Sequence, residues 1–511
     1  MAAVAKADLV LHDGAVLGHP DSDSLAVTGG EITAYGRFAA LKEYIGPRTS
    51  LLPLQGRAIA PGFIDSHLHF MEAAAVAAGN SVQRCRTITE LLADLRIAAG
   101  RTPPGNWLRA FGCDESLIYD RRGPTRAELD HSTPKNPLRL RHQTLHASWL
   151  NSRAIALLGL EKPQFQPPPG AVLVREADGR LSGLVIGMEE WLSARIGRVT
   201  SADAEARARV FSRELAAAGV TSITDATVRN TAEDLAALER LVLSGVIVQR
   251  TAAMAGPHNL PALHEITQRL KGAVRFAGIK FTGVERWTPP QLAGAVATAL
   301  RDQLDCAFHC TEVEELDAAL TAIEDARPRV PESAARCRIE HGGMIPLNFL
   351  GRLAAAAPWV VTNPGFIHYR GAKYAGEPGL LPFYYRARSL LDAGLRMAAA
   401  SDAPVTPPKP LLALSAAVSR TSQEGYAIAP DEALSAREAF AQWTSAAAEL
   451  ARLNAGVIAP GALADLIVLP ADPLSLPPAD LARLPVDVTI INGRVVYERG
   501  RPLNRNQEGA A

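Results

Sequence analysis

The sequence lacks the features that mark secreted and membrane proteins. Five cysteines in 511 residues are too few and too scattered to form a disulfide framework, so we expect reduced thiols. No stretch approaches the roughly 18 consecutive apolar residues of a membrane-spanning helix. The start of the chain has neither the charged head nor the apolar run of a signal peptide. These absences predict a cytoplasmic protein with no membrane partner.

An excess of charge of either sign is also absent. The 53 lysines and arginines are balanced by 53 aspartates and glutamates. A balanced chain without a basic patch produces no field that attracts nucleic acid, so we expect no nucleic-acid partner. Internal repeats and low-complexity tracts are missing as well. With 48% hydrophobic and 21% charged residues, the composition is that of a globular protein.

The middle of the chain alternates short β-like runs with helical stretches rich in Ala, Leu, Glu and Arg. Such alternation predicts βα units around a parallel sheet. Eight runs qualify as strands, which predicts an α/β fold of the (β/α)8 TIM-barrel type. These candidate strands are residues 58–65, 220–225, 246–252, 276–281, 306–309, 337–341, 359–364 and 396–402.

Both ends of the chain have a different sequence pattern. Short apolar runs broken by turn signals fill residues 1–60 and recur in residues 455–511, where Asn492-Gly493 between two β-rich runs predicts a hairpin. We expect the two ends to form one discontinuous β-sandwich domain beside a barrel in residues 61–454. A Pro- and Gly-rich insertion at about residues 75–205 is predicted to form a subdomain or lid over the barrel mouth. An exposed edge of the sandwich could pair with a second copy of the chain, which would make a homo-oligomer.

The first candidate barrel strand ends in a His-x-His pair, His67 and His69. Residues two apart in a strand point to the same face, so the two imidazoles project together. Two neutral imidazoles on one face can share a divalent metal ion at about 2.0–2.1 Å. A His-x-His pair alone is weak evidence because chance pairs are common, but its place at the end of an apolar run favours a metal site.

Three further candidate ligands fall at the ends of other strands: His309 at the fifth, His341 at the sixth and Asp402 at the eighth. In a barrel these ends gather at one mouth, where active sites are built. Taken singly, each histidine could be an ordinary core or surface residue, and Asp402 could be a helix N-cap. Their joint placement at strand ends favours a shared metal site.

Lys280 lies among apolar residues at the end of the fourth strand. An ammonium beside a divalent cation is repelled and is costly to bury. Two outcomes are consistent with the sequence. The lysine carries a carbamate derived from CO2, an anion that bridges two metal ions, or it points outward into the helix layer and is structural.

These residues, in this order, resemble the ligand set of the amidohydrolase superfamily. Longer segments resemble its amidohydrolase-3 (YtcJ-like) branch, and the similarity runs from about residue 5 to residue 500. The segments that carry this resemblance are residues 124–130, 146–154, 338–342, 389–394, 400–405 and 460–469.

The resemblance implies a barrel with a β-sandwich made from both termini, and one or two divalent ions, most simply Zn²⁺. It places His67, His69 and Asp402 on one ion and His309 and His341 on the second. A carboxylated Lys280 bridges them.

The implied enzyme hydrolyses carbon–nitrogen bonds other than peptide bonds in a small molecule, by attack of metal-bound hydroxide. Asp402 moves the proton. Alternatives are a cyclic amide, carbamate or ester substrate, a deaminase, or a non-catalytic assembly protein.

Two loops differ in sequence from the amidohydrolase-3 branch. After Lys280, relatives have a short Asp-Gly segment where this chain has Phe281-Thr282-Gly283, and after His309 they have Gly-Asp where it has Cys310-Thr311. Both loops are expected to face the substrate, so substrate selection is the open part of the interpretation.

Several residues are candidates for substrate contact. His146 could polarise the substrate carbonyl as a catalytic residue, or it could be structural. An ordinary exposed loop is the alternative for the residues that follow the seventh strand. Cys113 could line the pocket as a thiol, and Trp287 with Arg286 could clamp a carboxylate or an aromatic ring. The candidates for substrate contact are Cys113, Trp287, Asn363, Phe366, His368 and Tyr369.

Overall fold

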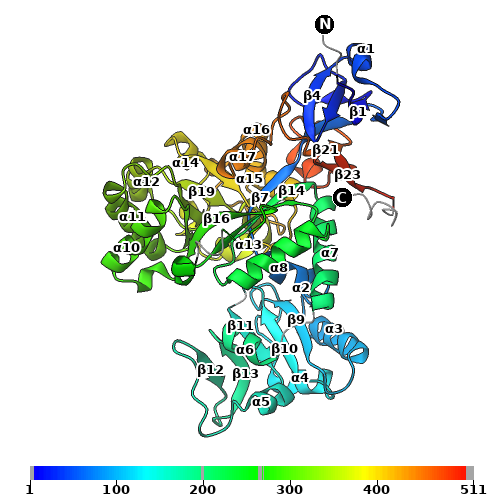
Figure 1. Cartoon of the computed structure of the whole chain (residues 1–511). Coiled ribbons are helices and arrows are strands. Elements are labelled where there is room, and N and C mark those ends of the chain that lie inside the picture. Colours follow the sequence, from blue (N-terminus) through cyan, green and yellow to red (C-terminus); the bar gives the residue numbers. More distant parts are fainter. Residues whose placement is uncertain (1–4, 145, 197–200, 263–267, 269, 502–511) are drawn as a thin grey trace. The chain divides into compact units, whose positions relative to one another are not determined.

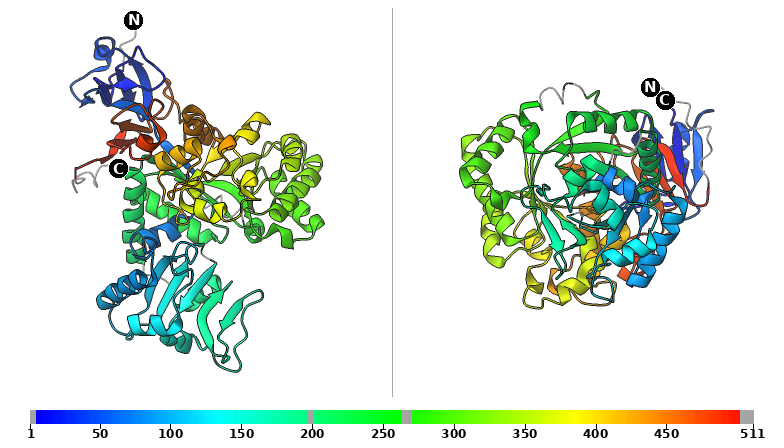
Figure 2. Two further views of the ribbon diagram at one scale, coloured as in Figure 1. Left: turned by 180° about the vertical axis from the view of Figure 1, so that it is seen from behind. Right: turned by 90° about the horizontal axis from the view of Figure 1, so that it is seen from below.

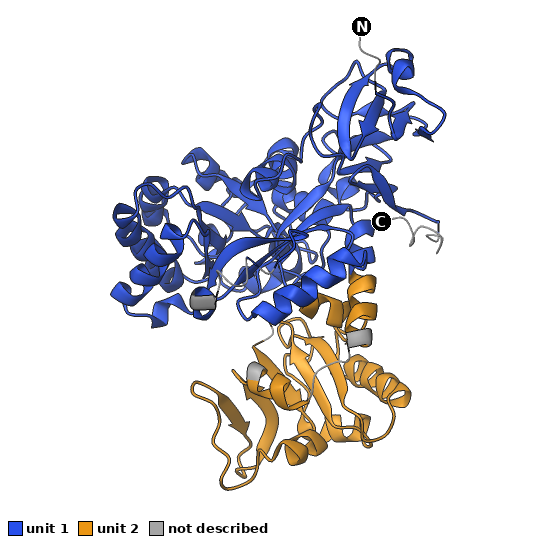
Figure 3. Cartoon of the chain, viewed as in Figure 1, with its two compact units in different colours: residues 1–70, 212–511 blue, residues 71–211 orange. Residues whose placement is uncertain are grey.

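The computed structural model describes residues 5–144, 146–196, 201–262, 268 and 270–501. The chain divides into two compact units (Figure 3). Unit 1 contains residues 1–70 and 212–511, and unit 2 contains residues 71–211. The insertion predicted at about residues 75–205 lies within unit 2, and its role as a lid stays a prediction. The predicted boundary between sandwich and barrel falls inside unit 1 and also stays a prediction.

Unit 1 is built around a ring of eight parallel strands, each hydrogen-bonded to its neighbour in chain order (Figures 1 and 2). The strands are β7 (Phe63–Leu68), β14 (Val220–Asp225), β15 (Arg250–Ala255), β16 (Val274–Phe281), β17 (Cys306–Cys310), β18 (Cys337–His341), β19 (Trp359–Thr362) and β20 (Met397–Ala399). Every residue of β7, β14, β18 and β19 is buried, as expected for strands covered by helices outside and packed by side chains inside. The predicted TIM-barrel fold is confirmed.

Helices surround the ring of strands (Figure 2). Several begin at residues whose side chains satisfy the exposed backbone N–H groups of the first turn. Thr231 and Asp234 form such a capping box at α8, and Glu312 and Glu315 form one at α11. The helices are α7 (Ser201–Ala217), α8 (Ala232–Leu243), α10 (Pro289–Arg301), α11 (Val313–Ala326), α12 (Leu350–Ala356), α13 (Pro364–Ala375), α14 (Arg388–Asp392), α15 (Pro410–Ser419), α16 (Ala436–Trp443) and α17 (Ser445–Leu450).

The predicted strand at residues 58–65 is two strands. Its first half is β6 (Ala58–Pro61), which belongs to a different sheet, and its second half begins β7. The chain passes between the sheets at Gly62, where a Cβ atom would lie 2.3 Å from the side chain of Thr221. Pro61 and Gly62 are poor strand residues, and together they separate the two sheets. The third strand also begins later than predicted, at Arg250.

The two termini form the β-sandwich. One sheet holds β4 (Glu31–Gly36), β3 (Ser24–Thr28), β1 (Leu9–His12) and β5 (Ser50–Pro53), in that order. The other holds β2 (Ala15–Val16), β6, β21 (Leu466–Leu469), β22 (Val488–Ile491) and β23 (Arg494–Glu498). The antiparallel pairing of β6 with β21 joins the ends, and one core cluster contains apolar residues from both. The predicted hairpin is confirmed: Asn492 and Gly493 link β22 to β23 with φ of 52° and 72°.

Unit 2 contains a six-stranded mixed sheet with helices packed on it (Figure 1). Its strands are β8 (Asn80–Ser81), β9 (Leu108–Cys113), β10 (Leu138–His142), β11 (Ala147–Leu150), β12 (Val172–Arg175) and β13 (Leu181–Ile186). Its helices are α2 (Phe70–Ala77), α3 (Ile88–Arg101), α4 (Arg126–Ser132), α5 (Ser152–Leu158) and α6 (Glu189–Ile196), and it also holds α7 as far as Phe211. Within the described residues of the whole chain, none of the helices has the length and apolar character needed to cross a bilayer.

Candidate metal centre

The barrel closes where β7 meets the segment after β20. The backbone N–H of Asp402 donates to the carbonyl of His67 at 2.9 Å, and the N–H of His69 donates to the carbonyl of Ala403 at 2.8 Å. The Asp402 carboxylate therefore lies between two imidazoles, with Oδ1 3.5 Å from His67 Nε2 and 3.3 Å from His69 Nε2. Asp402 is not a helix N-cap, because α15 begins only at Pro410.

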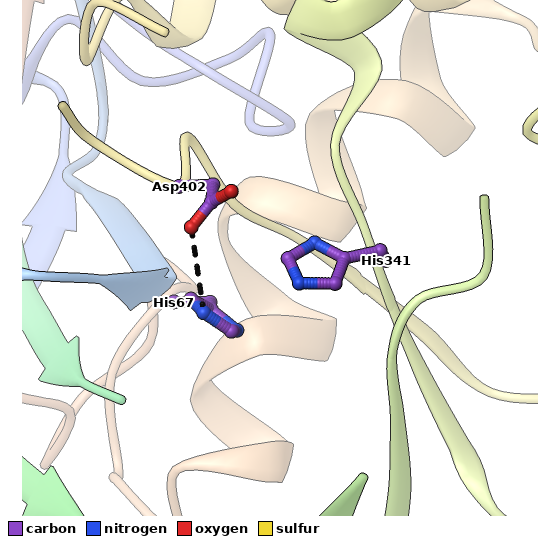
Figure 4. Close-up of side chains that lie close together, drawn as sticks. All are labelled: His67, His341 and Asp402. Carbon is purple, nitrogen blue, oxygen red and sulfur yellow. Dashed lines mark ion pairs between the residues drawn. The ribbon is translucent and has the colours of Figure 1, made fainter. Parts of the chain in front are cut away.

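Two more histidines, His309 in β17 and His341 in β18, lie close to this group. The ligand atoms of His67, His341 and Asp402 all lie within 4.8 Å of one another (Figure 4). His309, at the end of β17, places its Nδ1 atom 3.0 Å from His341 Nε2. The five predicted His and Asp ligands are thus brought together at one end of the barrel.

Two of these residues have a backbone conformation that non-glycine residues seldom adopt. His341 has φ of 70° and Asp402 has φ of 56°. In a regular strand, Glu340 and His341 would point to opposite faces. Because the backbone turns at His341, Glu340 contacts His67 while His341 contacts His309. Backbone strain of this kind is concentrated at functional sites.

The hydrogen bonds of three imidazoles suit them to metal binding. In each ring Nδ1 faces a fixed polar group: the Glu340 carboxylate for His67, the Thr227 hydroxyl at 3.0 Å for His69, and the Asn363 carbonyl oxygen at 2.8 Å for His341. Asn363 is held in this orientation because its amide nitrogen donates to the carbonyl of Ala400. Because Glu340 and Asn363 present acceptor oxygens, Nδ1 of His67 and of His341 carries the ring proton, and the lone pair of these two rings is on Nε2, the atom that faces the cluster. The Thr227 hydroxyl can donate or accept, so it orients the His69 ring without fixing its tautomer. This donor set fits a divalent metal ion.

Lys280 faces the barrel interior and not the helix layer. It is 2% exposed, and within the described part of the chain its Nζ atom has no hydrogen-bond partner. The pKa of Lys280 is lowered to about 8, chiefly by burial and in part by the nearby Arg338 guanidinium, against the opposing effect of Glu340 and Asp402. A buried amine without a partner, next to the histidine cluster, fits the predicted carbamate.

An ion pair that the sequence analysis did not single out lies beneath the cluster. Arg338 donates from two nitrogens to the carboxylate of Glu340, and the same guanidinium donates to the carbonyl of Ser66 at 2.9 Å. Glu340 is fully buried. Arg338 and Glu340 are two residues apart in a strand whose residues are all buried, so the sequence did contain a signal for a buried charge pair on one face.

The electrostatics of the cluster favour neutral imidazoles and an ionised aspartate. Burial lowers the pKa of His67 and of His341 below the ordinary value, and the charge of Lys280 acts in the same direction. Burial opposes ionisation of Asp402, but the hydrogen bond from His69 and the positive charge that the neighbouring imidazoles carry at acid pH outweigh it and hold its pKa below the ordinary value. Neutral imidazole and carboxylate are the forms that bind metal ions.

A second group of potential ligands, in unit 2, is better explained without a metal. Ligand atoms of Asp114, Glu115 and His142 also lie within 4.8 Å of one another. The backbone N–H of Thr144 donates to His142 Nδ1 at 3.0 Å, so the ring proton of the neutral imidazole is on Nε2. That atom lies 3.3 Å from the Glu115 carboxylate, which it meets as a donor and not as a metal ligand.

The candidate substrate residues of unit 1 differ in how far their side chains are exposed to solvent. Phe366 is buried, and its ring stacks at 6.4 Å on that of His341. Asn363 is buried under His341, where it orients the imidazole, so it is not an exposed wall. Trp287 follows the short turn Val284–Arg286 and is half-buried, with its ring 6.3 Å from that of Phe281. His368 and Tyr369 are half-buried on α13.

The two candidates in unit 2 differ in accessibility. Cys113 is buried in the core of that unit, and burial raises the pKa of its thiol, which makes the group unreactive. His146 is exposed, and its carbonyl accepts a hydrogen bond from Gly187 at 2.9 Å. Contact of either side chain with a substrate stays a prediction.

The sequence pattern of the amidohydrolase family matches residues 52–497, most of the chain. The chain belongs to the amidohydrolase family. The match covers the barrel and the candidate metal cluster, and it confirms the resemblance found in the sequence. In TIM-barrel enzymes the mouth formed by the carboxyl ends of the strands holds the active site.

The sequences of known relatives align with nearly the whole length of this amidohydrolase. It is 26% identical to the N-substituted formamide deformylase of Arthrobacter pascens, with 94% of this chain and 95% of that protein aligned. It is 24% identical to the protein YtcJ of Bacillus subtilis strain 168, with 94% and 96% aligned. A metal-dependent hydrolase from Pyrococcus horikoshii OT3 has the same fold, with a TM-score of 0.72 over 92% of this chain and 99% of that one at 21% identity.

Proposed function

We propose that this protein is a metal-dependent hydrolase that cleaves a carbon–nitrogen bond of the amide type in a small molecule. One observation carries the proposal: Nε2 of His67 and of His69 lies 3.5 and 3.3 Å from Asp402 Oδ1, Nε2 of His341 faces His309, and each of these three rings is oriented through its Nδ1 atom. A cluster of merely structural histidines would not need these three rings to be oriented so that Nε2 faces another candidate ligand.

We assign the ligands by the contacts within the cluster. His67, His69 and Asp402 lie around one point and would hold one ion. His309 and His341 face each other and would hold a second. Nitrogen and oxygen donors in this number suit Zn²⁺ first, and Mn²⁺ or Fe²⁺ less well. When bound, such an ion lowers the pKa of a water ligand and polarises a carbonyl group.

Lys280 would join the two sites as a carbamate. The neutral amine adds to CO2, a new N–C bond forms, and one amine proton leaves to solvent, which gives a carboxylate on Nζ. A pKa of about 8 leaves an appreciable part of the lysine neutral near pH 7.5, and the neutral form is the one that reacts. The change replaces a buried cation beside two metal ions with an anion, which removes the electrostatic conflict.

Asp402 would move the proton of the reaction. Its Oδ1 atom faces both His67 and His69, so the carboxylate is close to any water that these residues help to hold. An ionised carboxylate accepts a proton from the attacking water and returns it to the leaving nitrogen. Burial lowers the pKa of His67 and of His341, so these two imidazoles are neutral and do not compete for this proton.

The substrate class is proposed from the relatives as well as from the cluster. One relative is an N-substituted formamide deformylase, so an N-formyl or other N-acyl amine is our first choice. Cyclic amides, carbamates, esters and amidine-type rings are the alternatives, because the same cluster suits each of them. The loops after Lys280 and His309 differ from the usual pattern of the branch, and we expect them to decide among these.

The test is hydrolysis by the protein loaded with Zn²⁺, Mn²⁺ or Co²⁺. A panel of N-formyl amines, N-acyl amines, lactams, carbamates and esters is incubated with it, and release of amine or acid is measured. We expect turnover of at least one amide-type substrate and loss of turnover on chelation. A protein that binds no metal at this cluster and hydrolyses nothing would support the non-catalytic alternative instead.

A further inference from the structure

Asp225 is a buried carboxylate next to the strand that carries His69. It is the last residue of β14, it is 3% exposed, and its Cα atom pairs with that of Leu68, one residue before His69. The backbone N–H of Ala226 donates to the carbonyl of Leu68 at 2.8 Å and continues this pairing. A buried carboxylate is costly unless hydrogen bonds replace its contacts with water. The hydrogen-bond partners of Asp225 therefore show what this carboxylate holds in place.

This one carboxylate holds His69 from two sides. Asp225 Oδ2 accepts a hydrogen bond at 2.8 Å from the backbone N–H of Phe70, the residue that follows His69. Asp225 Oδ1 accepts one at 3.0 Å from the backbone N–H of Thr227, whose hydroxyl lies 3.0 Å from His69 Nδ1. The first contact fixes the backbone next to His69, and the second fixes the residue whose hydroxyl touches the His69 ring.

Asn230 keeps the carboxylate from turning. Its side-chain amide donates to Asp225 Oδ1 at 2.9 Å and to the carbonyl of Met254 in β15 at 2.9 Å. The backbone carbonyl of Asn230 in turn accepts a hydrogen bond from the side-chain amide of Asn259 at 2.9 Å. These bonds join the ends of β14 and β15, so the Asp225 carboxylate cannot rotate without breaking them.

His69 depends on such support more than His67 does. The side chain of His67 is 1% exposed and is held by the packing around it, whereas the side chain of His69 is 23% exposed. A ring that packing holds less tightly relies more on the hydrogen bond at its far nitrogen. A hydroxyl donates as well as accepts, so Thr227 can hold the His69 ring in either tautomer, with or without an ion on Nε2.

We propose that Asp225 is a positioning residue of the metal centre. Through Phe70 and Thr227 it sets the orientation of the His69 ring, so that Nε2 faces the ion assigned to His69. Asp225 itself would touch neither an ion nor the substrate. This inference rests on the proposed function only as far as the metal site, since it needs no particular substrate. The ion assigned to His309 should be affected little, because a different strand, β17, positions that residue.

The first test changes the hydroxyl that links Asp225 to the ring. Zn²⁺ is titrated into metal-free protein against a chelating indicator. In Thr227→Val we expect the affinity for the ion assigned to His69 to fall about 10–100-fold, while the ion assigned to His309 changes less than about twofold. Thr227→Ser keeps the hydroxyl and should stay within about threefold of the wild type. The control is Thr221→Val, because Thr221 is also buried but its hydroxyl donates to the carbonyl of Phe63; this variant should bind both ions normally.

The second test changes the carboxylate. The amide of Asp225→Asn has a single acceptor oxygen and cannot serve both arms of the clamp, so we expect the same selective loss of the ion assigned to His69. Asp305→Asn is the matched control. Asp305 is also buried, and its carboxylate accepts from the backbone N–H of Arg336 and pairs with Arg452. Thermal unfolding of the metal-free protein should show both variants destabilised, but Asp305→Asn should keep the metal affinity of the wild type.

A third measurement reports the geometry of the bound ion and does not depend on turnover. Each protein is saturated with Co²⁺, whose visible absorption changes with its coordination. We expect altered spectra in Thr227→Val and Asp225→Asn, and wild-type spectra in Thr227→Ser and Asp305→Asn.

Unchanged affinity and spectrum in both Thr227→Val and Asp225→Asn would overturn the inference, as would an equal loss of metal in Asp305→Asn. Wild-type protein that binds no metal would overturn the inference together with the proposed function. Selective loss of the ion assigned to His69 in these variants, by a protein that hydrolyses nothing, would overturn the proposed function and keep the positioning role of Asp225.

Discussion

His309 Nδ1 and His341 Nε2 face each other at 3.0 Å. Because Asn363 occupies His341 Nδ1, the facing nitrogen of His341 is an acceptor, and without a cation His309 must supply the proton between them. A metal ion that binds to both nitrogens replaces that proton. The pair is therefore built so that metal binding and proton release are coupled.

The first prediction follows from this pair. His309→Asn should lower the metal content by about one ion per chain and reduce turnover at least tenfold, because the remaining cluster still holds the ion at His67 and His69. Mass spectrometry of bound metal and the hydrolysis assay check this. His131→Asn, an exposed histidine on α4, is the control and should change neither. Unchanged metal content in His309→Asn would refute the assignment.

Asp402→Asn should separate metal binding from catalysis. The amide oxygen still serves as a weak ligand, but it cannot accept the proton of the attacking water. We expect kcat to fall by about 10³-fold while most of the metal is retained. Metal content and kcat are measured side by side, with Asp431→Asn, on the exposed surface, as the control. An Asp402→Asn variant that keeps its full activity would exclude the proton-transfer role.

The pH dependence has a defined sign. The pKa values of His67 and His341 are lowered from 6.5 in the folded protein, so between 6.5 and those lowered values the unfolded chain binds more protons than the folded one. Stability of the metal-free protein should hold above pH 6.5 and decline as the pH falls below it. Metal affinity should decline in the same direction, since protonated imidazole cannot ligate. Thermal unfolding and metal titration from pH 8 to about 5 check this, and a rise in either toward acid would contradict it.

Lys280 provides a prediction that depends on dissolved CO2. Protein loaded with metal in the presence of bicarbonate should hold two ions, whereas protein prepared free of CO2 should hold fewer and be less active. Lys280→Ala should lose the bridging group, and a short carboxylic acid such as propionate should restore part of the activity. The carbamate carbon is measured by NMR after labelling with ¹³C-bicarbonate.

The control for this prediction is Lys373→Ala, a change at an exposed lysine of α13. It should leave both metal content and activity unchanged. Two metal ions and full activity in Lys280→Ala would show that the lysine is structural.

Glu340 and Arg338 should act as a unit. Glu340→Gln weakens the anchor of His67 and leaves the buried Arg338 without its counter-ion, which we expect to lower the free energy of unfolding by about 3–5 kcal/mol. Metal affinity should fall about 10–100-fold.

The double variant Arg338→Met with Glu340→Gln removes the uncompensated charge and should recover most of the stability but not the metal affinity. Chemical unfolding and metal competition separate the two effects. Equal metal affinity in wild type and Glu340→Gln would show that the pair serves stability alone.

Much of the architecture was predictable because it depends on local patterns. Residues 220–225 and 337–341 were placed as strands with the bounds that the structure has, since apolar β-rich runs between helical stretches are a short-range signal. The first strand was placed too broadly because apolar runs on both sides of Gly62 look alike in sequence. They differ only in which sheet they join.

The sequence by itself determined the types of the candidate ligands, their order and their position at strand ends, because parallel strands bring their carboxyl ends to one mouth whatever the packing details. Only the tertiary structure decided which nitrogen of His67 and of His341 faces the cluster, and that Lys280 lies inside without a described partner. These features depend on hydrogen-bond partners such as Glu340 and Asn363, which come from other strands and loops. Such pairings between distant segments leave no periodic trace in a single sequence.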